Sequence, residues 1–196
     1  DTVLQPQCGM PAHWAANELA RNFLRSDKDS LLLIDDDMVF PMSALHRMRE
    51  NRDNWEYDVV MALAVRRNWR EPTPVTMRHM GEAPMPQALR GDHFEKQPRN
   101  IKAGVVKEED AVGLAFTLIR RGVLEAMINE KWGLEHTHDF FTYGPGRESD
   151  DIPFSRRCRA LGFRMAVDAT IKIGHLTAVP LGWDDYMRWL KVQEDE

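Results

Sequence analysis

Apolar and polar positions along this chain fall into blocks that predict alternating helices and strands. Residues 12–28 have apolar side chains near one face and charged side chains on the others, which is typical of an amphipathic helix. Leu31–Ile34 is a continuous apolar run, as expected of a strand that is buried on both faces. A short helix is expected over residues 43–52, because Pro41 lies where a helix can begin.

The rest of the chain continues this alternation. Further strands are expected over 58–65, 112–119 and 163–168, with a short hairpin around 75–80. Helices are expected over 121–128, 152–161 and 184–192. Gly162 is well placed to end the helix over 152–161. Strands that alternate with helices predict an α/β fold with a mixed, mainly parallel sheet flanked by helices.

No linker interrupts the pattern, so one domain is expected over residues 1–196, with a helical tail from about 182 to 196. Two stretches, 68–100 and 132–147, are long for connections inside a compact domain. Such long loops tend to cover or bind a ligand, so we expect them to contact the substrate.

Composition excludes some classes of protein. The chain has 26 basic and 31 acidic residues and a net charge of −5, which argues against a nucleic-acid partner. No apolar run approaches the roughly 20 residues of a transmembrane helix. Cys8 and Cys158 fit no metal-binding spacing, so two free thiols in a reducing compartment and a cytoplasmic location are expected.

Candidate chemistry begins at the end of the first predicted strand. In "LLLIDDDMVFP" the apolar run is followed directly by Asp35, Asp36 and Asp37. Ligands of open α/β sheets bind beyond the carboxyl ends of the strands. Divalent cations such as Mg²⁺ and Mn²⁺ take carboxylate oxygens and often share them with substrate phosphates. The acids therefore predict a divalent-metal site.

Three other interpretations stay open. The run also fits the D-x-D-x-V of haloacid-dehalogenase phosphatases, but the second acidic pair of that chemistry would be Asp150-Asp151, which follows "YGPGRE" rather than a strand. A phosphoacceptor receiver module needs an Asp after "VVMALAV", where Arg66 and Arg67 stand. An acidic loop that caps the next helix needs only one Asp.

The segment "ARNFLRSDKDSLLLIDDDMVFP" resembles the nucleotide-sugar-dependent glycosyltransferases of the GT-A fold, in particular the family-2-like group. Those enzymes carry an Arg-Asn pair, an apolar strand and then a D-x-D. Here the pair is Arg21-Asn22, and the D-x-D is Asp35 and Asp37 with Asp36 between them. The resemblance implies a GT-A-like, Rossmann-like fold and assigns the donor nucleotide-sugar to Arg21, Asn22, Asp35 and Asp36.

Later segments extend the resemblance to roughly residues 20–178. "VGLAFTLIRRGVLEAM" is similar to the acceptor-side glycine strand and its helix, which adds Gly113 to the binding residues. "ESDDIPFSRRCRALGFRMAVD" is similar to the segment in which an acidic pair opens a helix, and "IKIGHL" resembles a late Gly-His. The resemblance implies that Asp151, with Asp150 as the close alternative, is the catalytic base.

The implied function is transfer of a sugar, of the hexosyl type, from a nucleoside diphosphate such as UDP to a glycan or other hydroxyl acceptor. The implied metal ligands are Asp37, Asp35 and His175. Because imidazole is a normal ligand of Mn²⁺, we expect Mn²⁺ rather than Mg²⁺. Trp132, Phe140, Phe141 and Tyr143 are candidates for an acceptor pocket, although core packing is expected for at least two of them.

The chain also departs from this family. Members normally form the nucleobase pocket from a strand, a loop and a helix before the Arg-Asn pair, whereas 20 residues precede Arg21 here. We therefore expect a shortened N-terminal nucleotide-binding unit. This keeps a second hypothesis open, in which the chain is a non-catalytic or truncated relative that binds metal or glycan without turnover.

Overall fold

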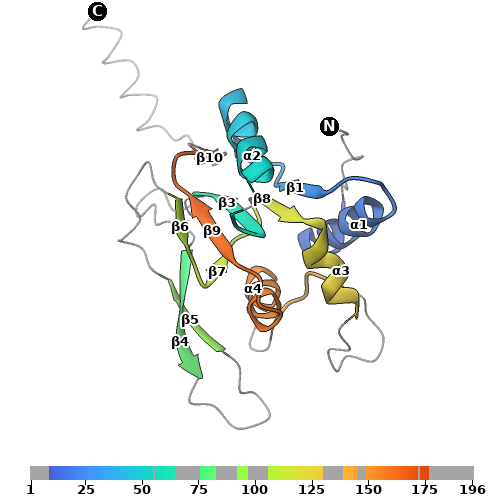
Figure 1. Ribbon diagram of the computed structural model, residues 1–196, viewed down its shortest axis with the longest axis vertical. Helices are drawn as coiled ribbons and strands as arrows, with labels where there is room; N and C mark the ends of the chain where they lie inside the picture. The colour runs from blue at the N-terminus through green and yellow to red at the C-terminus, as the bar shows by residue number, and fades with distance from the viewer. Residues whose placement is uncertain are drawn as a thin grey trace, which may run out of the picture.

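The structure is a computed structural model that describes residues 9–54, 56–64, 76–82, 92–96, 106–129, 139–144, 149–171 and 173–176 (Figure 1). The helices are α1 (Ala12–Leu24), α2 (Met42–Asn54), α3 (Arg121–Asn129) and α4 (Asp151–Ala160). The strands are β1 (Ser30–Ile34), β2 (Met38–Val39), β3 (Val59–Ala62), β4 (Thr76–Glu82), β5 (Asp92–Lys96), β6 (Val106–Glu108), β7 (Ala111–Val112), β8 (Phe116–Arg120), β9 (Met165–Asp168) and β10 (Gly174–His175).

The central sheet has five strands in the order β1-β8-β3-β9-β6. Only β3 and β9 pair in parallel within it, and the other three neighbouring pairs are antiparallel. The α/β class is confirmed, but the mainly parallel sheet is wrong, because a continuous apolar run reports burial on both faces and not strand direction. Since β8 is antiparallel to both β1 and β3, the strands β1, β3 and β9 share one direction and end at a common edge, called here the carboxyl edge.

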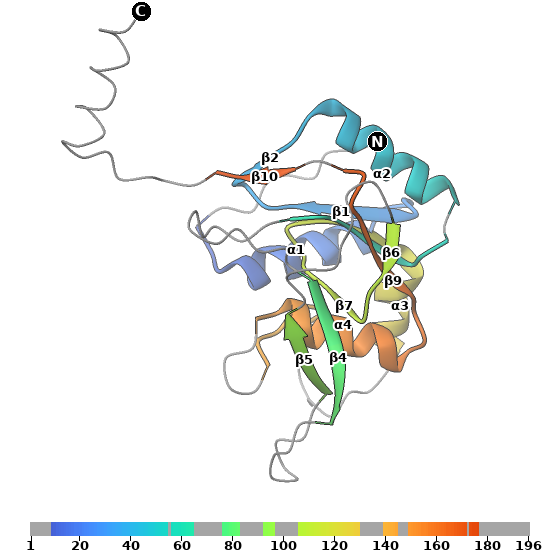
Figure 2. The same cartoon turned by 90° about the vertical axis from the view of Figure 1, so that its left-hand side faces the viewer.

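Helices cover both faces of this sheet (Figure 2). The face that carries Leu31 and Leu33 packs against α1, α3 and α4, where Phe23, Leu124 and Phe154 are buried. The opposite face packs against α2, and its core is a separate cluster of buried residues: Met38, Ala44, Met48, Val60, Ala62, Ala64, Phe116, Leu118 and Ile171. Burial on both faces explains why β1, β3 and β9 read as apolar runs.

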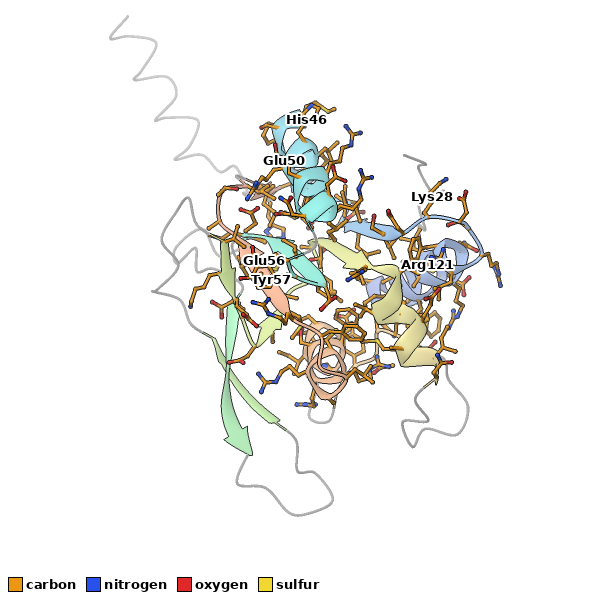
Figure 3. The ribbon with its side chains drawn as sticks, in the orientation of Figure 1. Lys28, His46, Glu50, Glu56, Tyr57 and Arg121 are labelled. Atoms are coloured by element: carbon orange, nitrogen blue, oxygen red, sulfur yellow. The ribbon has the colours of Figure 1, made fainter. Side chains whose placement is uncertain are left out.

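The four helices found in this part of the chain were all predicted, although α1 ends four residues before the predicted end. The Arg121 guanidinium explains where the helix stops (Figure 3). It donates to the Leu24 carbonyl oxygen at 3.3 Å, which the last helical turn leaves without an intrahelical partner. It also donates to the carbonyl oxygens of Ser26 at 2.6 Å and Lys28 at 2.5 Å, in the segment that follows the helix. Helix α4 ends as predicted, because Gly162 has a φ of +81°, a left-handed conformation that favours glycine.

The predicted strand over 112–119 is wrong, because two strands share this apolar run. β7 pairs with β4, whereas β8 pairs with β1 and β3. The break falls at Gly113, whose backbone N–H approaches Met61 Sδ at 3.0 Å and whose carbonyl accepts from Thr117 Oγ1 at 2.8 Å. Residues 76–82 form a single strand, β4, rather than a hairpin around 75–80. β4 pairs antiparallel with β5, and with β7 the two form a second sheet in the order β5-β4-β7.

Two other predictions can be compared with the structure. None of the helices in the described residues is long and apolar enough to cross a membrane. The Cys158 thiol is buried and free, and burial raises its pKa, which keeps it protonated and unreactive. Cys8, Trp132 and the predicted helix over 184–192 lie outside the described residues.

Candidate functional site

The three consecutive acids form a tight turn at the carboxyl edge. The Asp35 N–H donates to the Ala115 carbonyl at 2.8 Å, which continues the ladder between β1 and β8 for one more residue. The Met38 N–H then donates back to the Asp35 carbonyl at 3.2 Å and closes the turn. Asp35 and Asp36 are exposed and Asp37 is half-buried, so all three carboxylates can meet a ligand.

The turn is held next to His175 by the short sheet of β2 and β10 (Figure 2). His175 stands opposite Met38 in this antiparallel pair, and the Leu176 N–H donates to the Asp37 carbonyl at 2.7 Å. The histidine therefore reaches the acids from a segment far along the chain. The structure thus brings together the three residues that the sequence assigns to the metal: Asp35, Asp37 and His175.

The start of α4 reaches the same place. Asp150 occupies the N-cap position, yet its carboxylate makes no capping hydrogen bond to the helix. Asp151 is positioned differently, since its Oδ1 accepts a hydrogen bond from the Ser149 hydroxyl. Asp150 lies close enough to Asp35 to act on its ionisation. We call Asp35, Asp36, Asp37 and Asp150 the acid cluster.

The carboxylates of the acid cluster repel one another. Partial removal from water raises the pKa of Asp35, the carboxylates of Asp37 and Asp150 raise it further, and His175 acts in the opposite direction. Removal from water also raises the pKa of Asp150. The same cause raises the pKa of Asp151, although its hydrogen bond with Ser149 opposes the shift. Raised carboxyl pKa values of this kind often mark functional sites.

The donor atoms suit a divalent cation shared with a substrate. Among the residues described, no group of three or more histidine, cysteine or acidic side chains is arranged to hold a metal ion. Asp37 and His175 offer carboxylate oxygen and imidazole nitrogen, both of which Mn²⁺ accepts. Ions of this class commonly use one or two carboxylates together with substrate phosphates. Asp37 and His175 could therefore hold an ion only if a ligand completed its coordination.

The other predicted binding residues are placed apart from the acid cluster or contribute backbone only. The Arg21 guanidinium on α1 pairs with Glu18 at 2.5 Å and with Asp139. The Asn22 side chain accepts a hydrogen bond from Arg25 at 3.0 Å. Gly113 is buried, and its backbone contacts Met61 and Thr117 rather than the turn at Asp35.

Sequence reasoning missed the residues that hold segment 139–144 beside the site. Asn17 is 2% exposed, and its amide oxygen accepts from the Phe140 N–H at 2.7 Å while its amide nitrogen donates to the Phe141 carbonyl at 2.7 Å. On the other side, Arg157 donates to the carbonyls of Asp139, at 2.8 Å, and Phe140. We call Asn17 and Arg157, which hold this segment from two sides, the clamp. A polar Asn17 on the apolar face of α1 was the signal in the sequence that could have identified it.

The aromatic residues of this segment have different surroundings. Phe140 and Phe141 are buried, with exposures of 2% and 0%, and Phe141 packs on Phe154. The expectation that at least two of the candidate aromatics pack in the core is confirmed. Tyr143, in contrast, is 59% exposed and its ring contacts His13.

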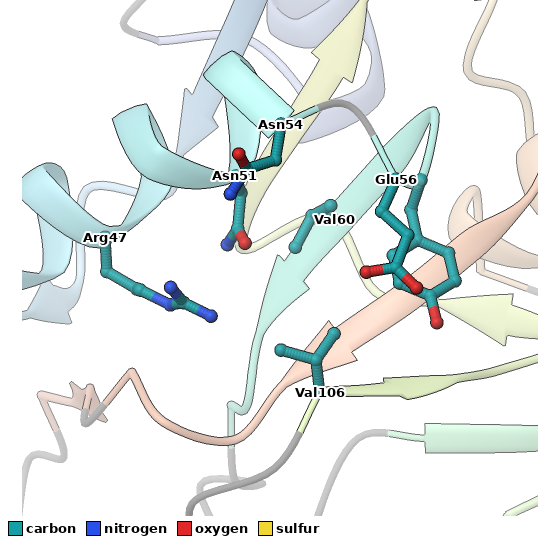
Figure 4. Close-up of a pocket in the computed structure, with 7 residues that line it drawn as sticks. Arg47, Asn51, Asn54, Glu56, Val60 and Val106 are labelled. Atoms are coloured by element: carbon teal, nitrogen blue, oxygen red, sulfur yellow. The ribbon is translucent and has the colours of Figure 1, made fainter.

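A second acid at the carboxyl edge lies against α2. Asp168 ends β9, is fully buried and accepts hydrogen bonds from Arg47 Nε at 2.9 Å and Asn51 Nδ2 at 2.8 Å. These two donors line a small pocket of about 70 Å³ between α2, β3 and β6 (Figure 4). Arg47 and Asn51 already donate to Asp168. We therefore interpret this group of polar residues as stabilising the fold rather than as binding a ligand.

Comparisons with known proteins bear on the fold. No family model and no curated protein matches the chain. Among solved structures 28 chains match. One of them is A197 from STIV, a viral protein, with 20% identity and a TM-score of 0.54 over 86% of this chain and 69% of A197. At this level of identity the likeness describes the fold alone.

Proposed function

We propose that this protein is a metal-dependent glycosyltransferase of the GT-A type, which moves a sugar from a nucleoside diphosphate donor to a hydroxyl acceptor. One observation carries the proposal: Asp35, Asp37, Asp150 and His175 meet at the carboxyl edge from three segments that are distant in sequence. Carboxylates that repel one another and raise a neighbour's pKa favour a bound cation. Ligands of open α/β sheets bind at this edge.

The metal-ligating atoms available at the site indicate how the sugar donor would bind. Asp37 and His175 would hold the ion, and the donor diphosphate would complete its coordination. When bound, the ion stabilises the negative charge of the departing diphosphate as a Lewis acid. Asp35 would hold sugar or ribose hydroxyls. Arg21 and Asn22 remain predicted nucleotide contacts, and Arg21 would have to release Asp139 to reach a phosphate.

Asp150 is better placed than Asp151 to be the catalytic base. The Asp150 carboxylate makes no cap hydrogen bond and acts directly on Asp35, whereas Asp151 is turned toward the Ser149 hydroxyl. Removal from water raises the pKa of both carboxylates, so the choice rests on this difference in their surroundings and not on the pKa. We therefore assign proton removal to Asp150 and treat Asp151 as the alternative.

Calorimetric titration of UDP and GDP, each with and without Mn²⁺, tests the donor site. Wild type should bind one nucleotide only with Mn²⁺, and Asp37→Ala should weaken that binding on the order of 100-fold or more. The matched control is Asp53→Ala, which removes an exposed carboxylate on α2 and should bind as wild type does. An equal loss of nucleotide affinity in both variants, or nucleotide binding that is independent of Mn²⁺, contradicts the proposed metal site.

Turnover separates a transferase from a relative that only binds. Release of free sugar from the corresponding nucleotide-sugar can be followed for wild type, Asp150→Asn and Asp151→Asn. A larger loss of kcat in Asp150→Asn, with nucleotide affinity retained, supports the assigned base. Nucleotide binding without any release or transfer of sugar would favour the non-catalytic hypothesis.

A further inference from the structure

An exposed group of aromatic rings lies beside the acid cluster. Trp14 and Tyr143 are each 59% exposed, although side chains of this size are usually buried to a greater extent. The His13 ring contacts both, with centroid separations of 5.9 Å to Trp14 and 4.5 Å to Tyr143 in edge-on geometry. We call these three residues the aromatic patch.

The aromatic patch is held in place by buried hydrogen bonds. His13 and Trp14 stand in the first turn of α1, where the Trp14 N–H donates to the Pro11 carbonyl at 2.9 Å. Tyr143 follows the segment that Asn17 ties to the same helix through the backbone of Phe140 and Phe141. Both halves of the patch are therefore fixed to α1, which lowers the entropy cost of binding a ligand.

The patch adjoins the acid that is best placed as the base. The charge of His13 acts on the Asp150 carboxylate and favours its ionised form. Asp150 in turn acts on Asp35. The aromatic patch, the half-buried Asp150 and the predicted donor site at Asp35 are therefore neighbours.

We propose that the aromatic patch binds a pyranose ring of a glycan acceptor and presents one of its hydroxyl groups to Asp150. This inference rests on the proposed function and names its acceptor class. A pyranose has an apolar C–H face that packs on an aromatic ring, while its hydroxyl groups point outward to polar partners.

Saturation-transfer-difference NMR with free disaccharides of glucose, galactose, mannose and N-acetylglucosamine tests the acceptor class. At least one disaccharide should bind wild type in the millimolar range. Trp14→Leu and Tyr143→Leu should each weaken that binding on the order of tenfold. Trp14→Phe keeps an aromatic ring and should retain most of the affinity. Tyr57→Leu is the matched control, since Tyr57 stacks on Arg164 before β3 begins, at the opposite edge of the sheet.

The outcomes separate this inference from the proposed function. If wild type binds none of the disaccharides, or if binding survives both leucine substitutions, the aromatic patch is not a glycan site. Mn²⁺-dependent nucleotide binding is measured on the same wild-type protein and tests the transferase by itself. Disaccharide binding that depends on Trp14, in a protein that binds no nucleotide, would support the glycan site and discard the transferase.

Discussion

Asp35 and Asp168 both stand at the carboxyl edge, but their surroundings are opposite. Asp168 is fully buried and accepts hydrogen bonds from Arg47, Asn51 and the Thr170 N–H, the last at 2.9 Å. Asp35 is exposed, and most of the groups that act on it are other carboxylates. The same strand-end position therefore serves stability in one case and offers unused binding capacity in the other.

The difference teaches that position on a sheet does not by itself make a functional site. Buried polar groups that stabilise a fold are almost always provided with partners. Carboxylates gathered without enough partners lower stability, and proteins retain them where they bind or react. The comparison can be tested by removing each acid in turn, because the two acids should change stability in opposite directions.

The largest effect is expected for Asp168→Ala. Removing this carboxylate leaves Arg47 and Asn51 without their acceptor at a buried position. Breaking such a pair from one side should lower the free energy of unfolding by about 3 kcal/mol, at the low end for buried pairs because Arg47 is partly exposed. Urea denaturation measures this change. The control Asp53→Ala, on the exposed side of α2, should alter the free energy of unfolding by less than about 0.5 kcal/mol.

A double-mutant cycle makes this test sharper. In wild type, Arg47→Met should be costly because it leaves Asp168 buried without its cation, whereas in the Asp168→Asn background the same change should cost less. The difference measures the coupling between the two side chains. Additive losses would show that Asp168 matters through packing alone, and the contrast with Asp35 would then lose its electrostatic basis.

Asn17→Ala should have the next largest effect. The substitution leaves the backbone groups of Phe140 and Phe141 without buried partners, and this should lower the free energy of unfolding by about 2 kcal/mol. Asn22→Ala on the exposed side of α1 removes the same amide and should have little effect on thermal unfolding. Similar melting temperatures for the two variants would contradict a structural role for the clamp.

Sequence patterns predicted the elements better than their arrangement. The apolar run of β1 and the glycine at 162 identified a buried strand and a helix end, because both signals are local. The direction of β8 was missed, since burial on both faces leaves the same pattern in parallel and antiparallel strands. The break at Gly113 was missed because the residues on both sides of it are apolar and buried in different sheets.

Only part of the candidate site was predicted, because only some of its features are local in the sequence. Asp35 and Asp37 follow a strand whose end can be read from the sequence, so their place at the edge was predictable. That Asp150 lies near Asp35 while Arg21 pairs with Asp139 depends on tertiary packing, which a local pattern does not contain. His13 resembles any polar residue of an amphipathic helix until the contact with Tyr143 is known.

The smallest and opposite effect is expected for Asp35→Asn. Partial removal from water and neighbouring carboxylates raise the pKa of Asp35 in the folded state, so its ionisation favours unfolding. Asparagine cannot ionise, and at pH 7 the variant should be more stable than wild type by about 0.5 kcal/mol, a small value because the group is exposed and screened by solvent. Urea denaturation at a series of pH values measures the difference.

The pH dependence of this difference gives the comparison its most specific test. A carboxyl whose folded pKa is raised contributes stability below its unfolded pKa, near 4, and that stability is lost as pH rises through the folded pKa. The advantage of Asp35→Asn should therefore shrink as pH falls through the folded pKa and vanish below about 4, and high salt should reduce it at pH 7. A variant less stable than wild type at pH 7 would mean that Asp35, like Asp168, has the partners that a structural acid requires.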